Sequence, residues 1–302
     1  MSILVTGGAG FIGSHIVDSL TSEGHDVVVL DDLSTGRREH VNKKAKFYEL
    51  GLNDAGLEKI FQKEKIDVVV HQAAQVSVRK SLSDPILDAE ANIKGTINLL
   101  ECCKKVEKFI YASSGGAVYG EPRYLPVDEE HPINPLSPYG VSKYIAEKYL
   151  QVYKELYDLD YIVLRYGNVY GPRQDPYGEA GVIAIFANKM LSNQSPTING
   201  DGAQTRDFVY ASDVARANLL AVEEDKSGIF NIGTGKETSV NEIFDVIKKT
   251  LNTNIKPRHA PPIKGEVRRI YLNVKKAERE LGWTPDIDVE EGIKKLLEQM
   301  KK

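Results

Sequence analysis

The sequence is poor in cysteine, tryptophan and methionine, with two, one and three of its 302 residues. The two cysteines, Cys102 and Cys103, are neighbours whose side chains would point in different directions on a helix, so we predict neither a disulfide framework nor a metal site. No apolar run reaches the roughly 18 residues of a transmembrane helix, and no secretory leader precedes the first apolar segment. These absences exclude disulfide-stapled and membrane-spanning classes and predict a reducing, cytoplasmic setting.

Charge of one sign is also missing. The chain has 39 basic and 43 acidic residues, a net charge of −4, and its basic residues are dispersed. This balance predicts that neither nucleic acid nor a membrane surface is the main partner. The length fits one large domain, or one domain with a smaller lobe.

Short β-branched runs alternate with amphipathic segments over the first half of the chain. The runs predict strands over residues 3–7, 25–32, 66–74, 108–114 and 160–171. The amphipathic segments predict helices over residues 11–24, 56–65, 88–106 and 138–157. This alternation predicts an α/β fold with a doubly wound parallel sheet of the Rossmann type.

A glycine-rich turn joins the first predicted strand to the first helix. The stretch TGGAGFIG at 6–13 satisfies G-x-G-x-x-G through Gly8, Gly10 and Gly13, and G-x-x-G-x-x-G if Gly7 replaces Gly8. Such a turn brings backbone and a helix N-terminus close to a pyrophosphate. Asp31 ends the second strand, where a carboxylate accepts hydrogen bonds from a ribose and repels a 2′-phosphate. We therefore predict NAD rather than NADP, with Asp32 a weaker candidate than Asp31.

Two further features belong to this expected nucleotide-binding unit. Ala73 and Ala74, in HQAAQVSV at 71–78, are small enough for a cofactor to lie against the backbone, although tight packing explains them equally well. Beyond residue 171 the strand–helix rhythm breaks, and a closing helix is predicted over 289–302. We predict an NAD-binding Rossmann domain over 1–171 plus about 207–234, and a smaller C-terminal substrate lobe over 172–206 and 235–302.

The stretch SPYGVSKYIAEKY at 137–149 contains two tyrosine–lysine pairs at helical i,i+4 spacing. Tyr139 and Lys143 lie in the first turns of a helix that Ser137 can cap, near the edge of the sheet where α/β sites form. Tyr144 and Lys148 lie on a different face of that helix. A phenol ionises near pH 10, so a catalytic Tyr139 requires nearby positive charge from Lys143 and an oxidised nicotinamide.

These segments together resemble one known family. TGGAGFIG, HQAAQVSV, SSGGAVYG, PYGVSK, LRYGNVYGP, TRDFVYASDVA and FNIGTG are similar to the extended short-chain dehydrogenases/reductases that act on nucleotide sugars. The resemblance covers essentially the whole chain. It implies that Tyr139 takes the proton of a sugar hydroxyl while a hydride moves to NAD, with Lys143 lowering the pKa of the phenol.

One stretch separates the activities within that family. The dehydratases and decarboxylases carry an acid just before V-Y-G, whereas this chain has Gly115, Gly116 and Ala117 there. The resemblance is therefore closer to the 4-epimerases of UDP-hexoses, which work through a 4-keto sugar. The family's usual Ser or Thr is replaced by Gly115, and we expect Ser114 to assist Tyr139 in its place.

The resemblance also implies a set of binding residues. Near residue 51 the family's adenine-binding aspartate is replaced by Gly51, followed by Leu52. The implied cofactor-binding residues are Gly7, Gly10, Phe11, Ile12, Gly13, Asp31, Asp32, Leu52, Ala73, Ala74, Asn92, Ser113, Tyr139, Lys143 and Tyr166. The implied UDP-sugar-binding residues are Ser77, Asn168, Val182, Thr197, Asn199, Arg206 and Arg268.

Family members commonly dimerise through two helices, which here correspond to residues 88–106 and 138–157. Leu99, Cys102, Tyr149 and Tyr153 could take part in a homodimer contact, although core packing explains them equally well. Alternative activities are epimerisation of UDP-glucuronate or a UDP-N-acetylhexosamine, or dehydration of a nucleotide sugar. A non-catalytic dinucleotide sensor is a further alternative, but it has no need of the Tyr139–Lys143 pair.

Overall fold

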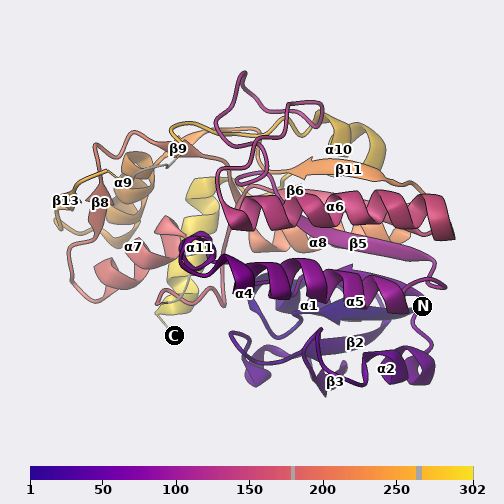
Figure 1. Ribbon diagram of the computed structural model, residues 1–302. Helices are drawn as coiled ribbons and strands as arrows, with labels where there is room; N and C mark the ends of the chain where they lie inside the picture. Colours follow the sequence, from indigo (N-terminus) through magenta and orange to yellow (C-terminus); the bar gives the residue numbers. More distant parts are fainter. Residues whose placement is uncertain (178–180, 263–266, 302) are drawn as a thin grey trace.

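A computed structural model describes residues 1–177, 181–262 and 267–301. The main element is a seven-stranded sheet in the order β11-β6-β5-β4-β1-β2-β3, with every neighbouring pair parallel (Figure 1). Its strands are β1 Ser2–Thr6, β2 Asp26–Asp31, β3 Lys46–Glu49, β4 Val68–His71, β5 Lys108–Ser114, β6 Asp160–Tyr166 and β11 Gly228–Ile232. The order reverses between β1 and β4, which confirms the doubly wound Rossmann prediction.

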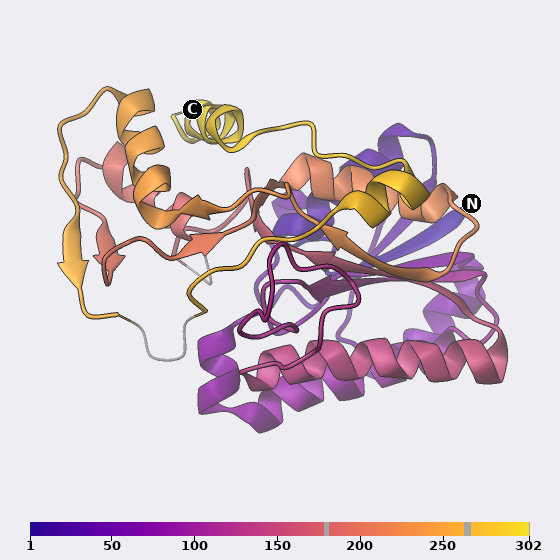
Figure 2. The same cartoon turned by 90° about the horizontal axis from the view of Figure 1, so that it is seen from above.

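Helices cover both faces of this sheet, as the view from above shows (Figure 2). One layer contains α1 Phe11–Ser22, α8 Ala211–Glu223 and α10 Lys275–Leu281. The other contains α2 Leu57–Glu64, α5 Gly95–Cys102 and α6 Pro138–Tyr157. Successive residues of a strand point to opposite faces. Ile3 and Val5 therefore pack in the first layer and Leu4 in the second.

A second group of elements forms the smaller lobe, drawn on the left of Figure 1. Its core lies between α7 Val182–Leu191, α9 Val240–Leu251 and α11 Val289–Met300, with β10 Phe208–Tyr210 beside β7 Asn168–Tyr170. Two further short strand pairs complete the lobe. They are β8 Thr197–Asn199 with β13 Arg258–Ala260, and β9 Thr205–Arg206 with β12 Thr238–Ser239. The short elements α3 Val78–Ser83, α4 Pro85–Ala89, the π-helix η2 Glu90–Lys94 and the 3-10 turn η1 Arg38–His40 complete the chain.

Two predicted elements differ from those observed. The expected strand over 160–171 is divided at Gly167 into β6 and β7, and β7 pairs with β10 outside the main sheet. A Cβ at Gly167 would lie 2.7 Å from the Asp207 carbonyl oxygen, so the chain leaves the sheet where the backbone of β10 approaches closely. The expected helix over 88–106 is instead α4, η2 and α5, and the π-turn widens it around Asn92.

The C-terminal segment returns to the nucleotide-binding unit before it enters the lobe. Ala277, Leu281 and Trp283 belong to the core beside β11 and α8, and Trp283 Nε1 donates to the Asp213 carbonyl oxygen at 2.9 Å. No helix in the described part of the chain combines the length and apolarity needed to cross a membrane.

Candidate active site

The glycine turn after β1 has the shape that a dinucleotide requires. Gly7 has φ +69, and a Cβ there would lie 2.7 Å from the Ala73 backbone nitrogen. A Cβ at Gly13 would lie 2.1 Å from the Gly7 carbonyl oxygen. Gly10 is the N-cap of α1 and leaves the helix N-terminus without a side chain over it. Gly8 is also closely packed, since a Cβ there would lie 2.8 Å from Val29 Cγ1.

Asp31 lies beneath this turn, at the end of β2. Its two carboxylate oxygens accept from the Ala9 and Leu33 backbone N–H groups at 3.0 and 2.9 Å. Burial raises the pKa of Asp31, and the two N–H groups oppose that rise. Asp32, in contrast, is exposed and accepts from Ser34. The buried position of Asp31 at the sheet edge matches the ribose-binding carboxylate better than Asp32 does.

The region expected to meet adenine contains a carboxylate that the sequence did not reveal. Asp54 Oδ2 accepts from the Gly51 backbone N–H at 2.8 Å and would lie 3.0 Å from a Cβ at Gly51. A carboxylate is therefore present beside the position where the family usually has aspartate. Leu52 packs between the sheet core and Gly95 of α5. Phe11 and Ile12 form the first turn of α1, with Ile12 packed against the core.

The loop after β4 is fixed by side chains from the neighbouring helices. The Ala73 N–H donates to Thr6 Oγ1 at 3.2 Å, and Ala74 follows it at the sheet edge. Asn92, at the π-turn, accepts from the Gln75 N–H at 2.8 Å and donates to the Gln75 carbonyl at 2.9 Å. Ser77 is buried and caps α3. The Asn92 amide therefore shapes the loop.

Tyr139 and Lys143 occupy the first turns of α6, as the sequence predicts. Ser137 caps this helix by accepting from the Gly140 N–H at 3.1 Å. Lys143 is buried, and its ammonium donates to the Ala112 carbonyl at 2.9 Å and lies 5.9 Å from the centre of the Tyr139 ring. The second pair is placed differently, because Lys148 is exposed and lies over the ring of Tyr144, which packs against the cluster around Val118 and Tyr119. Only the first pair faces the sheet edge.

Burial makes the Tyr139 phenol less acidic than a free tyrosine. Burial raises its pKa to about 12, a hydrogen bond with the Ser114 side chain lowers it, and Asp88 raises it. Burial also lowers the pKa of Lys143 to about 8, while Asp88 and Glu147 raise it.

The two serines at the end of β5 point in opposite directions. Ser114 contacts Tyr139, as expected. The Ser113 hydroxyl donates to Glu147 Oε1 at 2.5 Å behind the strand, so any contact of Ser113 with a cofactor would use its backbone. A Cβ at Gly115 would lie 2.8 Å from Leu272 Cδ1, which explains why no hydroxyl-bearing side chain stands at that position.

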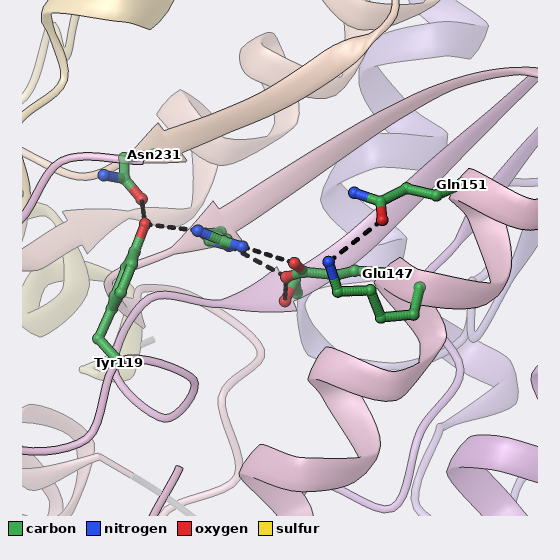
Figure 3. A network of polar contacts seen from close by, with 7 residues as sticks. Tyr119, Glu147, Gln151 and Asn231 are labelled. Carbon is green, nitrogen blue, oxygen red and sulfur yellow. Dashed lines mark hydrogen bonds and ion pairs between the residues drawn. The ribbon is translucent and has the colours of Figure 1, made fainter. Parts of the chain in front are cut away.

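A buried polar network lies behind β5, the strand that ends in Ser113 and Ser114 (Figure 3). Arg165 donates twice to Glu147, through Nε at 3.0 Å and Nη2 at 2.6 Å, and donates to the Tyr119 hydroxyl through Nη1 at 2.9 Å. Tyr119 in turn donates to Asn231 Oδ1 at 2.8 Å. The network joins α6, β6, the V-Y-G segment and β11, and the sequence gives no local pattern that reveals it.

The residues expected around the nicotinamide and the sugar have varied surroundings. The Tyr166 hydroxyl is buried and accepts from Asn218 Nδ2 at 2.8 Å. Asn168 begins β7, and its Oδ1 would lie 3.6 Å from a Cβ at Gly116. The structure therefore brings Asn168 close to the glycine pair before V-Y-G.

The residues expected to bind the nucleotide of the sugar lie in the smaller lobe. Arg206 donates to the Thr205 carbonyl at 2.8 Å, and Arg268 forms two 2.8 Å hydrogen bonds to the Asp201 carboxylate. The remaining expected residues, at the start of α7 and the two ends of β8, are Val182, Thr197 and Asn199. The two arginines are therefore held by partners within the lobe.

Comparison with known proteins agrees with this geometry. A protein of Methanocaldococcus jannaschii is 58% identical over 99% of this chain and 98% of its own length. The crystal structure of the UDP-glucose 4-epimerase of Thermotoga maritima with UDP-glucose is 48% identical, with a TM-score of 0.98 over 100% of this chain and 99% of that chain. The UDP-glucose 4-epimerase of Thermus thermophilus in complex with NAD is 44% identical, with a TM-score of 0.94 over 100% and 99% of the two chains.

Structures with other sugar nucleotides are also similar. A UDP-glucuronic acid 4-epimerase of Bacillus cereus in complex with NAD is 33% identical, with a TM-score of 0.92 over 100% of this chain and 99% of that chain. The model of the NAD dependent epimerase/dehydratase family matches residues 3–233, which include the glycine turn, Asp31 and the Tyr139–Lys143 pair. The chain therefore belongs to the NAD dependent epimerase/dehydratase family.

Proposed function

We propose that this protein is an NAD-dependent enzyme that reversibly inverts C4 of a UDP-hexose, with UDP-glucose and UDP-galactose as its substrate pair. The observation that carries the proposal is the Tyr139 phenol, which lies on the first turn of α6 beside Ser114 and above a buried Lys143. The two most similar crystal structures described above are of UDP-glucose 4-epimerases, which supports this substrate class.

The chain fits NAD on structural grounds. A side chain at Gly7 would collide with the Ala73 backbone and one at Gly13 with the Gly7 backbone, and Gly10 opens the helix N-terminus toward a pyrophosphate. The Asp31 carboxylate at the end of β2 suits a ribose diol and opposes a 2′-phosphate. When bound, NAD accepts a hydride from C4 of the sugar and returns it.

Tyr139 acts as the general base and then the general acid. Its phenolate takes the proton of the sugar 4-hydroxyl, and the phenol returns a proton to the 4-keto sugar after the sugar has presented its other face. Ser114 holds the phenol oxygen. A pKa of about 12 disfavours the phenolate at neutral pH. Positive charge from Lys143, and from the oxidised nicotinamide when it is bound, would lower the pKa of Tyr139. Each pKa unit lowers the free energy needed to form the phenolate by about 1.4 kcal/mol.

Epimerisation fits the site better than elimination. Among the described residues, a Cβ at Gly116 would meet Asn168 Oδ1 and Ser114 Oγ within 4 Å and no carboxylate, so a proton-transferring acid is missing from the place where the dehydratases carry one. We propose that Arg206 and Arg268 bind the diphosphate, because guanidinium groups pair with phosphate oxygens in a bidentate way. Asn168 would bind the sugar or phosphate. Ser77, Val182, Thr197 and Asn199 would complete the uridine and sugar pocket. UDP-glucuronate and UDP-N-acetylhexosamines stay as alternative substrates.

The test is turnover of UDP-galactose by the purified protein, measured with a coupled assay for UDP-glucose. We expect Tyr139→Phe to lower kcat by about 10²–10⁴-fold, the usual contribution of a general acid–base group. Tyr144→Phe is the matched control, because it removes the phenol of the second pair, and it should keep its activity. Full activity of Tyr139→Phe would disprove the mechanism, and a panel of UDP-sugars decides between the alternative substrates.

We also propose that the protein is a homodimer. Val152 and Leu156, on the outer face of α6, are 48% and 66% exposed, and Ile86 on α4 is 72% exposed. An apolar groove beside them is lined by Pro85, Ile86, Ala89, Glu90, Ile93, Lys94 and Ile97. Figure 2 shows these helices together on one face of the sheet, where a second copy could form a four-helix contact.

The four residues for which the sequence left a dimer contact and core packing equally open lie at the core. Leu99 and Tyr153 lie in the sheet core, and Cys102 and Tyr149 pack against that core. We therefore expect Leu156→Glu to give a monomer in sedimentation velocity experiments, whereas Leu136→Glu, in the exposed loop before α6, should leave the mass unchanged. A monomeric wild-type protein would refute the homodimer.

The division into an NAD-binding domain and a substrate lobe, a cytoplasmic location and a place in galactose metabolism are further parts of this proposal. Separate hydrophobic cores around the main sheet and around α7, α9 and α11 support the division. The unpaired Cys102 and Cys103 are compatible with a reducing compartment.

A further inference from the structure

Asp88 is a buried carboxylate for which the proposed reaction has no role. It lies on α4, is 1% exposed, and accepts through Oδ1 from Gln75 Nε2 at 2.8 Å and from Asn92 Nδ2 at 3.1 Å. None of the ion pairs formed within the described part of the chain includes it. A buried charge without a paired cation is costly, so the position of Asp88 requires an explanation.

A chain of hydrogen bonds connects Asp88 to α6, the catalytic helix that carries Tyr139 and Lys143. Asn92 Nδ2 lies 3.2 Å from Ser142 Oγ, and Ser142 Oγ donates to the Tyr139 carbonyl at 2.9 Å. Ser142 directly precedes Lys143. On its other side, Asp88 holds the Gln75 side chain, which also donates to the Ser77 carbonyl at 3.0 Å. Asp88 therefore lies between the loop after β4 and the first turns of α6.

Lys143, the residue after Ser142 in α6, is a buried cation. The ammonium donates to Ala112, a neutral carbonyl. Glu147, one turn further along α6, is already paired with Arg165 through two hydrogen bonds. The charge of Asp88 is compensated by no such pair, and it acts on both Lys143 and Tyr139.

The groups on the other elements do not replace Asp88. From β4, His71 is buried with its pKa lowered to about 3, so it is neutral. From β5, the Tyr111 ring lies 5.0 Å from the Lys143 ammonium, and burial holds its pKa well above the ordinary value. On α3, Arg79 and Lys80 are exposed to solvent. Among the described groups on these elements, Asp88 is therefore the carboxylate that acts on the catalytic pair without an ion pair of its own.

We propose that Asp88 is a positioning residue. Its buried carboxylate, through its hydrogen bonds to Gln75 and Asn92, holds the Gln75–Ser77 loop against α6 and places a negative charge behind Tyr139 and Lys143. This inference rests on the proposed catalytic role of Tyr139 and Lys143. It assigns to α4, a helix outside the expected catalytic motifs, control over the charge state of the site.

Removal of this charge has a predictable direction. Asp88 raises the pKa of both Lys143 and Tyr139, so Asp88→Asn lowers both. Turnover requires a protonated Lys143 and a deprotonated Tyr139. The acid and alkaline limbs of the pH profile therefore both move to lower pH, by about one unit for a nearby charge. A merely structural carboxylate would lower activity equally at all pH values.

The experiment measures kcat against pH for the enzyme with bound NAD, with UDP-galactose as substrate. Asp88→Asn should have its optimum at lower pH, and Asp88→Glu should restore the wild-type limbs. Ser142→Ala removes a neutral member of the same hydrogen-bond chain and should leave both limbs in place. Asp213→Asn, a buried carboxylate on α8 that accepts from the backbone of residues 286 and 287, controls for general destabilisation.

A wild-type pH profile in a folded Asp88→Asn enzyme would overturn the inference. If that variant does not fold, Asp88→Ser provides the same loss of charge in a smaller side chain. An active Tyr139→Phe enzyme would refute the proposed function itself. An inactive Tyr139→Phe enzyme together with unshifted limbs in Asp88→Asn would refute only the role of Asp88.

Discussion

The two halves of the proposed site are held together in different ways. Behind β5, Arg165 and Glu147 form an ion pair with two hydrogen bonds, and their side chains are 3% and 1% exposed. In the smaller lobe, Arg268 and Asp201 form a pair of the same chemistry, with side chains that are 55% and 61% exposed. A guanidinium–carboxylate pair is therefore buried in one half of the site and exposed to solvent in the other.

This difference follows from water. A buried charge that loses its partner keeps the full penalty of desolvation, whereas an exposed charge is solvated again. The catalytic half is consequently organised before any ligand arrives. In the lobe, the exposed Arg268–Asp201 pair costs little free energy to separate, which suits the phosphate-binding role proposed for Arg268. The contrast can be tested in each half with single substitutions.

The largest effect is expected at the buried pair. Glu147→Gln should lower the free energy of unfolding by about 3–5 kcal/mol, because it leaves the Arg165 guanidinium uncompensated among Ser113 and Tyr119. The measurement is urea denaturation at pH 7. The double substitution of Glu147→Leu with Arg165→Met should recover most of the loss, because it removes both charges. A single variant as stable as the wild type would remove the contrast between the halves.

An intermediate effect is expected from acid. His71 is buried between Thr6 Oγ1 and Thr96 Oγ1, and burial lowers its pKa to about 3. Between pH 6.5 and pH 3 the unfolded chain binds a proton there and the folded chain does not, so stability falls as the pH falls. His71→Gln should flatten this dependence in denaturation curves collected from pH 7 to pH 4. His259→Gln, in the exposed β13, should leave it unchanged.

The smallest effect on stability is expected at the exposed pair. Asp201→Asn should change the free energy of unfolding by less than about 1 kcal/mol, as for other surface ion pairs. The KM for the UDP-sugar should fall while kcat stays constant, because a carboxylate no longer competes with the diphosphate for Arg268. A loss of stability comparable to that of Glu147→Gln would show that the lobe is as firmly organised as the catalytic half.

The sheet could be predicted because its signals are local. Continuous β-branched runs and the glycine turn identify β1, β2, β4 and β5, and the predicted α6 coincides with the observed Pro138–Tyr157. The π-turn at Asn92 could not be predicted, because the hydrogen bonds that favour it come from Gln75 and Ser142. The break at Gly167 likewise depends on the approach of Asp207, which is distant in sequence.

The site shows the same limit. Tyr139, Lys143 and Asp31 were predictable, since each belongs to a motif placed at a strand or helix end. The orientation of Ser113 toward Glu147 and the position of Asp88 depend on which helix packs over the strand. A sequence shows Asp88 only as an ordinary polar residue of a helix. Charge balance within a site is a property of the packed structure.

The late position of β11 in the chain has a consequence for biosynthesis. Six strands of the main sheet are complete by Tyr166, but the seventh is Gly228–Ile232, and Trp283 packs beside it later still. While the intervening lobe is translated, β6 is an open edge with unpaired backbone groups. The nascent protein is therefore most prone to pair with other chains when more than half of it has left the ribosome, and chaperones that shield strand edges would act at that stage.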